Sequence, residues 1–381
     1  MFPVTSKLPN IRTTVFSVMS QLALEYNAIN LSQGFPDFDC PSELIDLVSL
    51  YMRKGNNQYA PMQGILPLRE KIAQKVFELH ASSYHPESEI TITSGGTQAI
   101  YTVIAAMVQP DDEVIIFEPA YDSYAPTIQL QGGLVKALEL CPPHYKIDWE
   151  VVRKLINNRT RMIVLNSPQN PTGTILDEND IQQLIKIIAD TDILLLSDEV
   201  YEHIVFDKKQ HLSLAKYPEL RDRTFITASF GKLFHNTGWK VGYCIAPEKL
   251  MMEFRKIHQF LVFSVNTPIQ YAISDFLENK DYYLNLSVFF QQKRDHFRKL
   301  LRDTRFDILP CEGSYFQSVQ FSKISDESDH EFSKRLITEY GVAGIPTSAF
   351  YKNGLDFKVL RFCFAKKQET LDKAVERLMK I

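Results

Sequence analysis

Two lysines, a serine and several glycines lie close together in the stretch Ser229–Tyr243. Lys232 follows the run Thr224–Ser229, whose β-branched and aromatic residues predict a buried strand. A lysine held in a desolvated pocket loses its proton more readily, and its free amine can then attack carbonyl groups. Ser229 and Lys240 are suited to hold an anion such as a phosphate beside that amine. Solvated surface lysines are the alternative, but the combination favours a site in which Lys232 bonds covalently to pyridoxal phosphate.

A carboxylate ends another predicted strand. The apolar run Ile193–Leu196 predicts a buried strand, and it leads into Ser197–Tyr201. A carboxylate at a buried strand end is costly unless it is paired, so Asp198 requires a cation or a donor. A protonated pyridine nitrogen would provide both, and Tyr201 is close enough in sequence to reach the same ligand. The alternative is that Asp198 caps the following turn.

Two further turns follow predicted strands. Ser94–Gln98 carries two glycines between the strand Glu89–Thr93 and the helix Ala99–Val108, where exposed backbone N–H groups favour a phosphate. Asn166–Gly173 contains Asn-Pro-Thr-Gly after the strand Arg161–Leu165, at the edge where open α/β sheets bind ligands. Either segment alone is also compatible with an ordinary turn.

An arginine lies inside an apolar run near the C-terminus. Arg361 is part of the apolar run Leu360–Phe364, inside the predicted strand Lys358–Phe364. A lone buried arginine is costly without an anionic partner, and its planar fork suits a carboxylate. In residues 306–381 short strands alternate with helices, which predicts a second and smaller α+β unit. The predicted strands there are Phe306–Leu309, Ser314–Gln320, Val342–Ile345 and Lys358–Phe364.

The overall composition is that of a globular protein. Of 381 residues, 45% are hydrophobic and 23% charged, and the net charge of −4 argues against a nucleic-acid or membrane surface. The five cysteines are scattered without C-x-x-C spacing, which predicts reduced thiols, and we assign no residue to a metal. Met1–Asn10 lacks the apolar core of a secretory signal, and no run approaches the roughly 18 apolar residues of a membrane span. We therefore expect a cytoplasmic protein.

These motifs, taken together and in this order, resemble the class I/II aminotransferases of fold type I. The similarity spreads along nearly the whole chain and points to the branch of kynurenine and bacterial methionine aminotransferases. It implies an α/β fold with a large, doubly wound, mostly parallel sheet domain and a smaller α+β domain. The expected boundaries are 46–289 for the large domain, and 1–45 with 290–381 for the small one.

The resemblance also implies a role for each matching residue in binding pyridoxal 5'-phosphate. Lys232 is the covalent and catalytic lysine, and Asp198 holds the pyridine nitrogen. Tyr121 stacks on the ring with Tyr124 nearby, and Asn170 and Tyr201 bind the ring oxygen. The phosphate is held by Gly96, Thr97, Ser229 and Lys240. Many relatives have arginine where Lys240 stands, so at this position a compact ammonium group replaces a guanidinium that could donate two parallel hydrogen bonds.

The same resemblance assigns the substrate and the partner. Gly34, Asn170 and Arg361 bind the substrate carboxylate, and Tyr59 reaches the cofactor phosphate of a second subunit, which implies a homodimer with shared active sites.

The expected reaction moves the amino group of methionine or an aromatic amino acid, kynurenine among the candidates, to a 2-oxo acid. Positions near the expected pocket are aromatic and include no arginine: Phe16, Phe35, Phe38, Tyr59 and Phe263. The alternatives are a cysteine-conjugate β-lyase of the same fold, which would release pyruvate and ammonia, and a non-catalytic amino-acid-binding relative.

Overall fold

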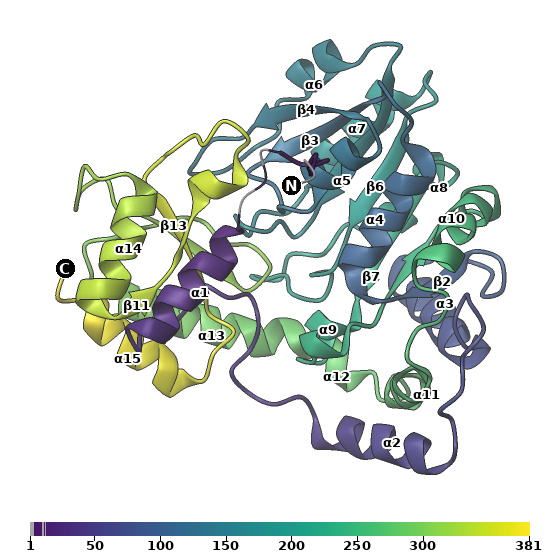
Figure 1. Cartoon of the computed structure of the whole chain (residues 1–381), viewed down its shortest axis with the longest axis horizontal. Coiled ribbons are helices and arrows are strands. Elements are labelled where there is room, and N and C mark those ends of the chain that lie inside the picture. The colour runs from purple at the N-terminus through teal and green to yellow at the C-terminus, as the bar shows by residue number, and fades with distance from the viewer. Residues whose placement is uncertain (1–3, 10, 12) are drawn as a thin grey trace.

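The computed structural model describes residues 4–9, 11 and 13–381, and its largest element is a seven-stranded sheet (Figure 1). The strand order is β2-β8-β7-β6-β5-β3-β4. Neighbours from β7 to β4 pair in parallel, whereas β8 runs antiparallel to both β7 and β2. The bounds are β2 Ile90–Thr93, β3 Glu113–Glu118, β4 Leu134–Glu139, β5 Thr160–Asn166, β6 Leu194–Asp198, β7 Thr224–Ser229 and β8 Gly242–Ile245.

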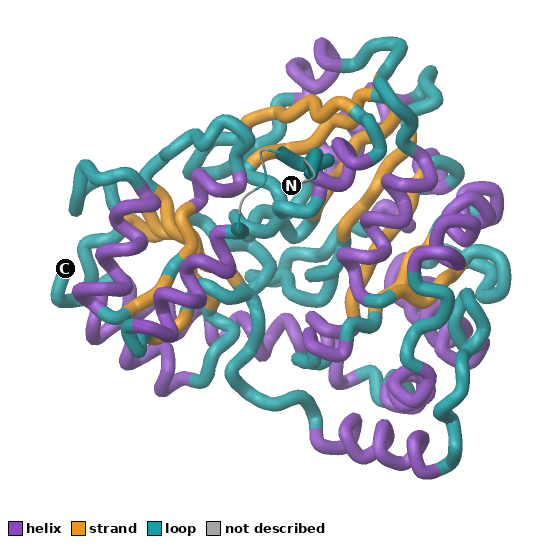
Figure 2. The backbone as a smooth tube through the Cα atoms, viewed as in Figure 1, coloured by secondary structure: helices purple, strands orange, loops and turns teal. Residues whose placement is uncertain are grey.

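Helices accompany this sheet because parallel strands need crossover connections (Figure 2). The bounds are α3 Leu66–His80, α4 Gly95–Met107, α5 Tyr124–Leu130, α6 Trp149–Leu155, α7 Glu178–Ile188, α8 Pro218–Arg221, α9 Phe230–Leu233, α10 Glu248–Leu261, α11 Thr267–Phe276, α12 Asp281–Leu284 and α13 Leu286–Leu301. α2, Ser42–Arg53, packs on α11. Single 3-10 turns span Leu214–Lys216, Thr237–Trp239 and Thr347–Phe350.

Alternating side chains explain why the sheet is covered on both faces. In β3, Val114 and Ile116 pack in one hydrophobic cluster with residues of α4 and α10. Ile115 and Phe117 pack in a second cluster with residues of α6 and α7. Because successive residues of a strand point to opposite faces of the sheet, the apolar run Val114–Phe117 shows that β3 is buried on both faces. The large unit is therefore doubly wound.

A second, smaller region is built from both ends of the chain (Figure 1). Its antiparallel sheet has the order β12-β13-β10-β9, and the N-terminal helix α1 packs on α14. β1 pairs in parallel with β11, with Ile29 opposite Val342. The bounds are α1 Val15–Glu25, β1 Ile29–Asn30, β9 Asp307–Ile308, β10 Phe316–Gln320, α14 Asp329–Tyr340, β11 Val342–Ala343, β12 Ile345–Pro346, β13 Val359–Cys363 and α15 Gln368–Leu378. The domain boundaries 46–289, and 1–45 with 290–381, remain a proposal, and they fall within α2 and α13.

Among residues 4–9, 11 and 13–381, no helix combines the length and the apolar composition needed to cross a bilayer. The segment Met1–Asn10, for which we predicted no secretory signal, lies partly outside the described residues.

Candidate active site

The carboxyl ends of β5, β6 and β7 meet at one edge of the large sheet. Asn166 of β5 lies opposite Asp198 of β6, and Asp198 lies opposite Thr227 of β7. Because these strands are parallel neighbours, the polar residues that end them share one edge. A cavity of about 180 Å³ lies there, lined by Gly95, Gly96, Thr97, Ile100, Tyr121, Asn166, Asn170, Asp198, Val200, Tyr201, Ser229, Lys232, Thr237 and Lys240.

This cavity brings together the residues that the sequence assigned to the cofactor within one subunit. Nine of them line it, namely Gly96, Thr97, Tyr121, Asn170, Asp198, Tyr201, Ser229, Lys232 and Lys240. Gly34 and Arg361, predicted for the substrate, contact the cavity residues Lys232 and Asn170. Tyr59 does not line this cavity: it is 81% exposed, and its ring packs edge-on against Phe263.

Lys232 lies in the single turn α9, which begins directly after β7. Its Nζ donates to the Tyr315 hydroxyl at 2.9 Å and to the Gly34 carbonyl at 3.2 Å. Burial lowers the pKa of Lys232 to about 8, and the nearby cations Lys240 and Arg361 act in the same direction. An appreciable fraction of this amine is therefore unprotonated near neutral pH.

Asp198 is a buried carboxylate whose two hydrogen-bond partners are neutral. Its Oδ2 accepts from the Tyr124 hydroxyl at 2.5 Å, and its Oδ1 accepts from the Val200 backbone N–H at 3.3 Å. Burial raises the pKa of Asp198 to about 6, although both hydrogen bonds oppose the change. The hydrogen bonds described here therefore give the Asp198 carboxylate no cationic partner, and this suits it to bind a cationic ligand.

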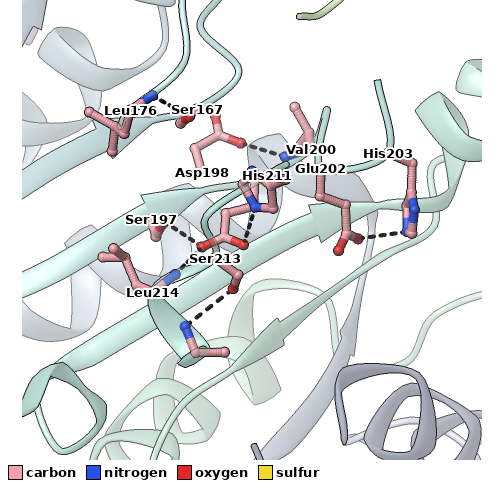
Figure 3. A network of polar contacts seen from close by, with 12 residues as sticks. Ser167, Leu176, Ser197, Asp198, Val200, Glu202, His203, His211, Ser213 and Leu214 are labelled. Atoms are coloured by element: carbon pink, nitrogen blue, oxygen red, sulfur yellow. Dashed lines mark hydrogen bonds and ion pairs between the residues drawn. The ribbon is translucent and has the colours of Figure 1, made fainter. Parts of the chain in front are cut away.

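A polar network holds the chain on either side of Asp198 (Figure 3). Glu199 accepts from the Ser197 hydroxyl at 2.7 Å and from the Leu214 backbone N–H at 3.1 Å, and it pairs with His211 at 2.8 Å. Burial opposes ionisation, but His211 and Ser197 hold the pKa of Glu199 below its usual value. These bonds fix the backbone at the end of β6, and therefore the direction of the neighbouring Asp198 carboxylate.

Close backbone packing marks the part of the cavity where α4 begins. Gly95 has φ +78°, which favours glycine, and a Cβ on Gly96 would lie 2.9 Å from Val200 Cγ1. The Ser94 side chain does not cap the helix, so it does not occupy the first N–H groups of α4. Lys240, in the left-handed conformation at φ +53°, brings its amine close to Gly95. N–H donors and a cation on one side of a cavity suit a phosphate.

Tyr121 lines the cavity after β3 and is held by a hydrogen bond between its hydroxyl and that of Thr97 at 3.1 Å. Its ring also packs edge-on against Tyr124, with centroids 5.7 Å apart. Burial raises the pKa of Tyr121, so it remains a neutral phenol.

Arg361 lies in β13 and is 1% exposed. Its Nη1 donates to Asn170 Oδ1 and its Nη2 donates to the Ser32 carbonyl, both at 2.7 Å. The guanidinium carbon lies 3.9 Å from the centroid of the Phe316 ring and 5.2 Å from that of Phe16. Its Nε has no hydrogen-bond partner among the described residues. A buried cation with an unused donor suits an incoming carboxylate.

The segment 31–40 brings Gly34 to the site and is anchored on the small region. Lys366 Nζ donates to the Phe35 carbonyl at 2.8 Å, and the Asp37 carboxylate accepts from Thr370 at 2.7 Å. A Cβ on Gly34 would lie 2.8 Å from Phe316 Cζ, so the backbone approaches an aromatic ring closely. Glycine fits this position because any larger residue would have to displace that ring.

Some residues of the site carried no functional assignment from the sequence. Tyr315 contacts Lys232 directly, and Asn166 and Thr237 line the cavity. Tyr315 falls within Ser314–Gln320, which predicts a strand and gives no sign of the contact with Lys232. Asn166 directly follows the predicted strand Arg161–Leu165, and this position at a strand end could have indicated a role in the site.

Comparison with known proteins identifies the family of the chain. The model of the family "Aminotransferase class I and II" matches residues 26–378. The chain is 48% identical over 377 residues to a methionine aminotransferase of Escherichia coli, covering 99% of this chain and 98% of that protein. A kynurenine–oxoglutarate transaminase of Dictyostelium discoideum is 31% identical over 420 residues, covering 100% of this chain and 97% of the relative.

The solved structures extend the agreement to the fold. The structure of a methionine aminotransferase from Escherichia coli has a TM-score of 0.98 at 48% identity, and each chain is covered to 100%. The resemblance and the fold class predicted from the sequence are confirmed. The chain therefore belongs to the class I and II aminotransferase family.

Proposed function

We propose that this aminotransferase uses pyridoxal 5'-phosphate, bonded through Lys232. The observation that carries the proposal is that Lys232, an amine with a lowered pKa, and Asp198, a buried carboxylate with neutral partners, line one cavity. A protonated pyridine nitrogen would supply the positive charge that Asp198 is short of. The residues of the cavity fit this cofactor.

The proposed phosphate site is the part of the cavity where α4 begins. The N–H groups at the start of α4, at Gly96 and Thr97, would donate to the phosphate together with Ser229 and Lys240. Tyr121 would stack on the ring. Asn170 and Tyr201 would bind the ring oxygen.

Within this arrangement each residue has a separate task. The cofactor, when bound, supplies an electron-poor ring that stabilises negative charge left at the substrate Cα. Arg361 and Asn170 bind the substrate carboxylate and so orient the Cα–H bond, with Gly34 beside them. Lys232 Nζ, as a free amine, would accept the proton from Cα of the donor, and in the second half-reaction it would give a proton to Cα of the acceptor. Asp198 would keep a proton at the ring nitrogen.

The proposed donors are methionine and aromatic amino acids, kynurenine among them, and the acceptor is a 2-oxo acid. The name of the Escherichia coli relative supports this, as do the aromatic rings around Arg361. Besides Lys232 and Arg361, which already have roles in the proposal, Lys366 and Lys293 lie beside segment 31–40, and each of these two lysines donates to a backbone carbonyl. A second carboxylate on the substrate would therefore be desolvated without a free cation.

A competition assay tests this donor preference. Purified holoenzyme is given methionine, phenylalanine or aspartate with one common 2-oxo acid, and kcat/KM is measured for each. We expect methionine and phenylalanine to lie within about a hundredfold of each other, since small differences in an apolar pocket change affinity little. Aspartate should be the poorest donor. A preference for aspartate of about tenfold or more would contradict the proposal, because it would require a cation free to bind the second carboxylate.

The proposed assembly is a homodimer in which Tyr59 completes the site of the partner. Tyr59 is 81% exposed beside Phe263, and Phe260 in the same region is 85% exposed. Exposed aromatic rings gathered on one surface are typical of protein interfaces. A reducing, cytoplasmic location is part of the proposal, since all five cysteines are free thiols.

A further inference from the structure

Tyr315 is a buried neighbour of Lys232 that has no role in the proposed reaction. Its side chain is 1% exposed and packs edge-on against Tyr201 with ring centroids 5.1 Å apart. Its hydroxyl lies 2.9 Å from Lys232 Nζ and 2.5 Å from the Gly34 carbonyl oxygen. Lys232 Nζ is also 3.2 Å from that same carbonyl oxygen. Three polar groups therefore form a closed triangle.

The protons in this triangle can be assigned from the chemistry of the groups. A carbonyl oxygen only accepts, so the single hydroxyl proton of Tyr315 points to Gly34. The phenol oxygen then accepts an N–H from Lys232, and the Gly34 carbonyl accepts a second N–H. A neutral amine has two N–H groups, and both are now used. Its lone pair is left, directed away from both acceptors.

We propose that Tyr315 and the Gly34 carbonyl orient the free amine of Lys232, so that the proton exchanged with the substrate occupies the one position facing the cavity. Tyr315 is a positioning residue in this proposal, and the inference rests on the proposed role of Lys232. Lys232 lines the cavity, whereas Tyr315 and Gly34 do not, and this agrees with a lone pair directed into it.

The same triangle makes the proton transfer depend on the position of segment 31–40. Gly34 belongs to that segment, which is held on the small region through Lys366 and Thr370. If the segment moves, the amine loses the Gly34 carbonyl and Tyr315 loses its acceptor. Oriented proton transfer therefore requires the segment to be in place.

The test is Tyr315→Phe, which keeps the ring and removes the hydroxyl. The first readout uses cofactor-free protein: Lys232 is labelled with acetic anhydride over a range of pH, and the peptide is quantified by mass spectrometry. The charged groups around the amine stay in place, namely Lys240, Asp198 and Arg361, together with the Cys363 thiol. Loss of an acceptor disfavours the protonated amine, so we expect the labelling midpoint to fall by about one pH unit.

The second readout uses holoenzyme and a donor deuterated at Cα. A poorly oriented amine slows the transfer of the Cα proton and leaves substrate binding intact. We therefore expect kcat to fall about tenfold, KM to change less than about threefold, and the isotope effect on kcat to increase.

Tyr351→Phe is the matched control, because Tyr351 is also a buried tyrosine whose hydroxyl donates to a backbone carbonyl, that of Leu140 at 2.7 Å. It should lower the melting temperature to a similar degree and leave both readouts unchanged. An unchanged midpoint and isotope effect in Tyr315→Phe, with borohydride labelling still at Lys232, would overturn this inference alone. Borohydride labelling of another lysine in the wild type would overturn the proposed function itself.

Discussion

At the scale of single residues, the cavity contains an amine and a carboxylate whose charged forms are both disfavoured. Lys232 has its pKa lowered to about 8 and Asp198 has its pKa raised to about 6, in both cases chiefly by burial. Charged forms are disfavoured in a desolvated cavity unless a ligand compensates them. The pKa shift of each group therefore indicates the kind of ligand that the cavity binds.

Lys232→Ala should abolish turnover, because the variant has no amine to bond the cofactor or to move the Cα proton. Borohydride reduction of the wild-type holoenzyme should fix the cofactor on the peptide containing Lys232, and the variant should show no such adduct. An adduct on any other lysine of the wild type would show that the assignment is wrong.

Asp198→Ala should leave the fold largely intact and slow the reaction by about a hundredfold or more, the scale for removing a preorganised charged group. Circular dichroism checks the fold, and single-turnover kinetics measure the rate. Near-wild-type rates would remove Asp198 from the mechanism.

Asp198 also predicts a pH dependence of stability in the cofactor-free protein. Its proton is held more tightly in the folded state, with a pKa of about 6, than in the unfolded state, where the value is near 3.8. As the pH rises through this interval, the unfolded chain releases the proton first, so the unfolding free energy falls, by about 3 kcal/mol at most. Asp198→Asn should remove this decline. Urea unfolding between pH 4 and pH 7 compares the two proteins, and parallel curves would contradict the prediction.

Sequence reasoning identified the residues at this scale that end strands or lie in distinctive turns, such as Asp198 and Asn170. Tyr315 was missed because it meets Lys232 only through tertiary packing, between segments 83 residues apart. Nothing in the local pattern of a predicted strand distinguishes a tyrosine that only packs in the core from one whose hydroxyl contacts a lysine amine.

At the scale of elements, the strands that are buried on both faces were predicted within a few residues. β4, Leu134–Glu139, was missed because it is only partly buried and contains Lys, Ala and Glu, which do not favour strands. The predicted strand Val342–Ile345 is divided in the structure: β11 pairs with β1, and β12 pairs with β13. The division falls at Gly344, where a Cβ would lie 2.6 Å from the Phe362 ring.

The segment between β1 and α2 gives a prediction at this scale. In Gly34→Ala the new Cβ would press on Phe316, whose ring lies against the Arg361 guanidinium. The carboxylate site should be disturbed, and KM for the amino donor should rise about tenfold. Cofactor affinity, measured by absorbance titration, should stay the same because Phe316 does not line the cavity. A loss of cofactor affinity with unchanged KM would contradict this interpretation.

At the scale of the whole molecule, the proposed dimer would account for the exposed rings of Tyr59 and Phe260, and for the position of Tyr59 away from the cavity of its own chain. The sequence could indicate Tyr59 only by resemblance, because a contact between two chains leaves no periodic pattern in one chain.

Mixed dimers test the sharing of sites. Lys232→Ala and Tyr59→Phe subunits should each have low activity alone, and refolding them together should restore part of it. One site of each heterodimer would then combine a wild-type Lys232 with a wild-type Tyr59 from the partner. Activity after mixing is compared with the sum of the separate variants. A chain that sediments as a monomer at assay concentrations would exclude the shared site.

The parallel pairing of β1 with β11 also has a consequence for biosynthesis. Ile29 finds its partner Val342 about 300 residues later in the chain. At a translation rate of roughly 5–20 residues per second, the first strand emerges from the ribosome roughly 15–60 seconds before its partner exists. The large sheet, whose strands lie between residues 90 and 245, can form during that interval. β1 cannot form its strand pairing before β11 has been synthesised. A nascent chain would therefore expose α1 and β1 to chaperones until synthesis is nearly complete.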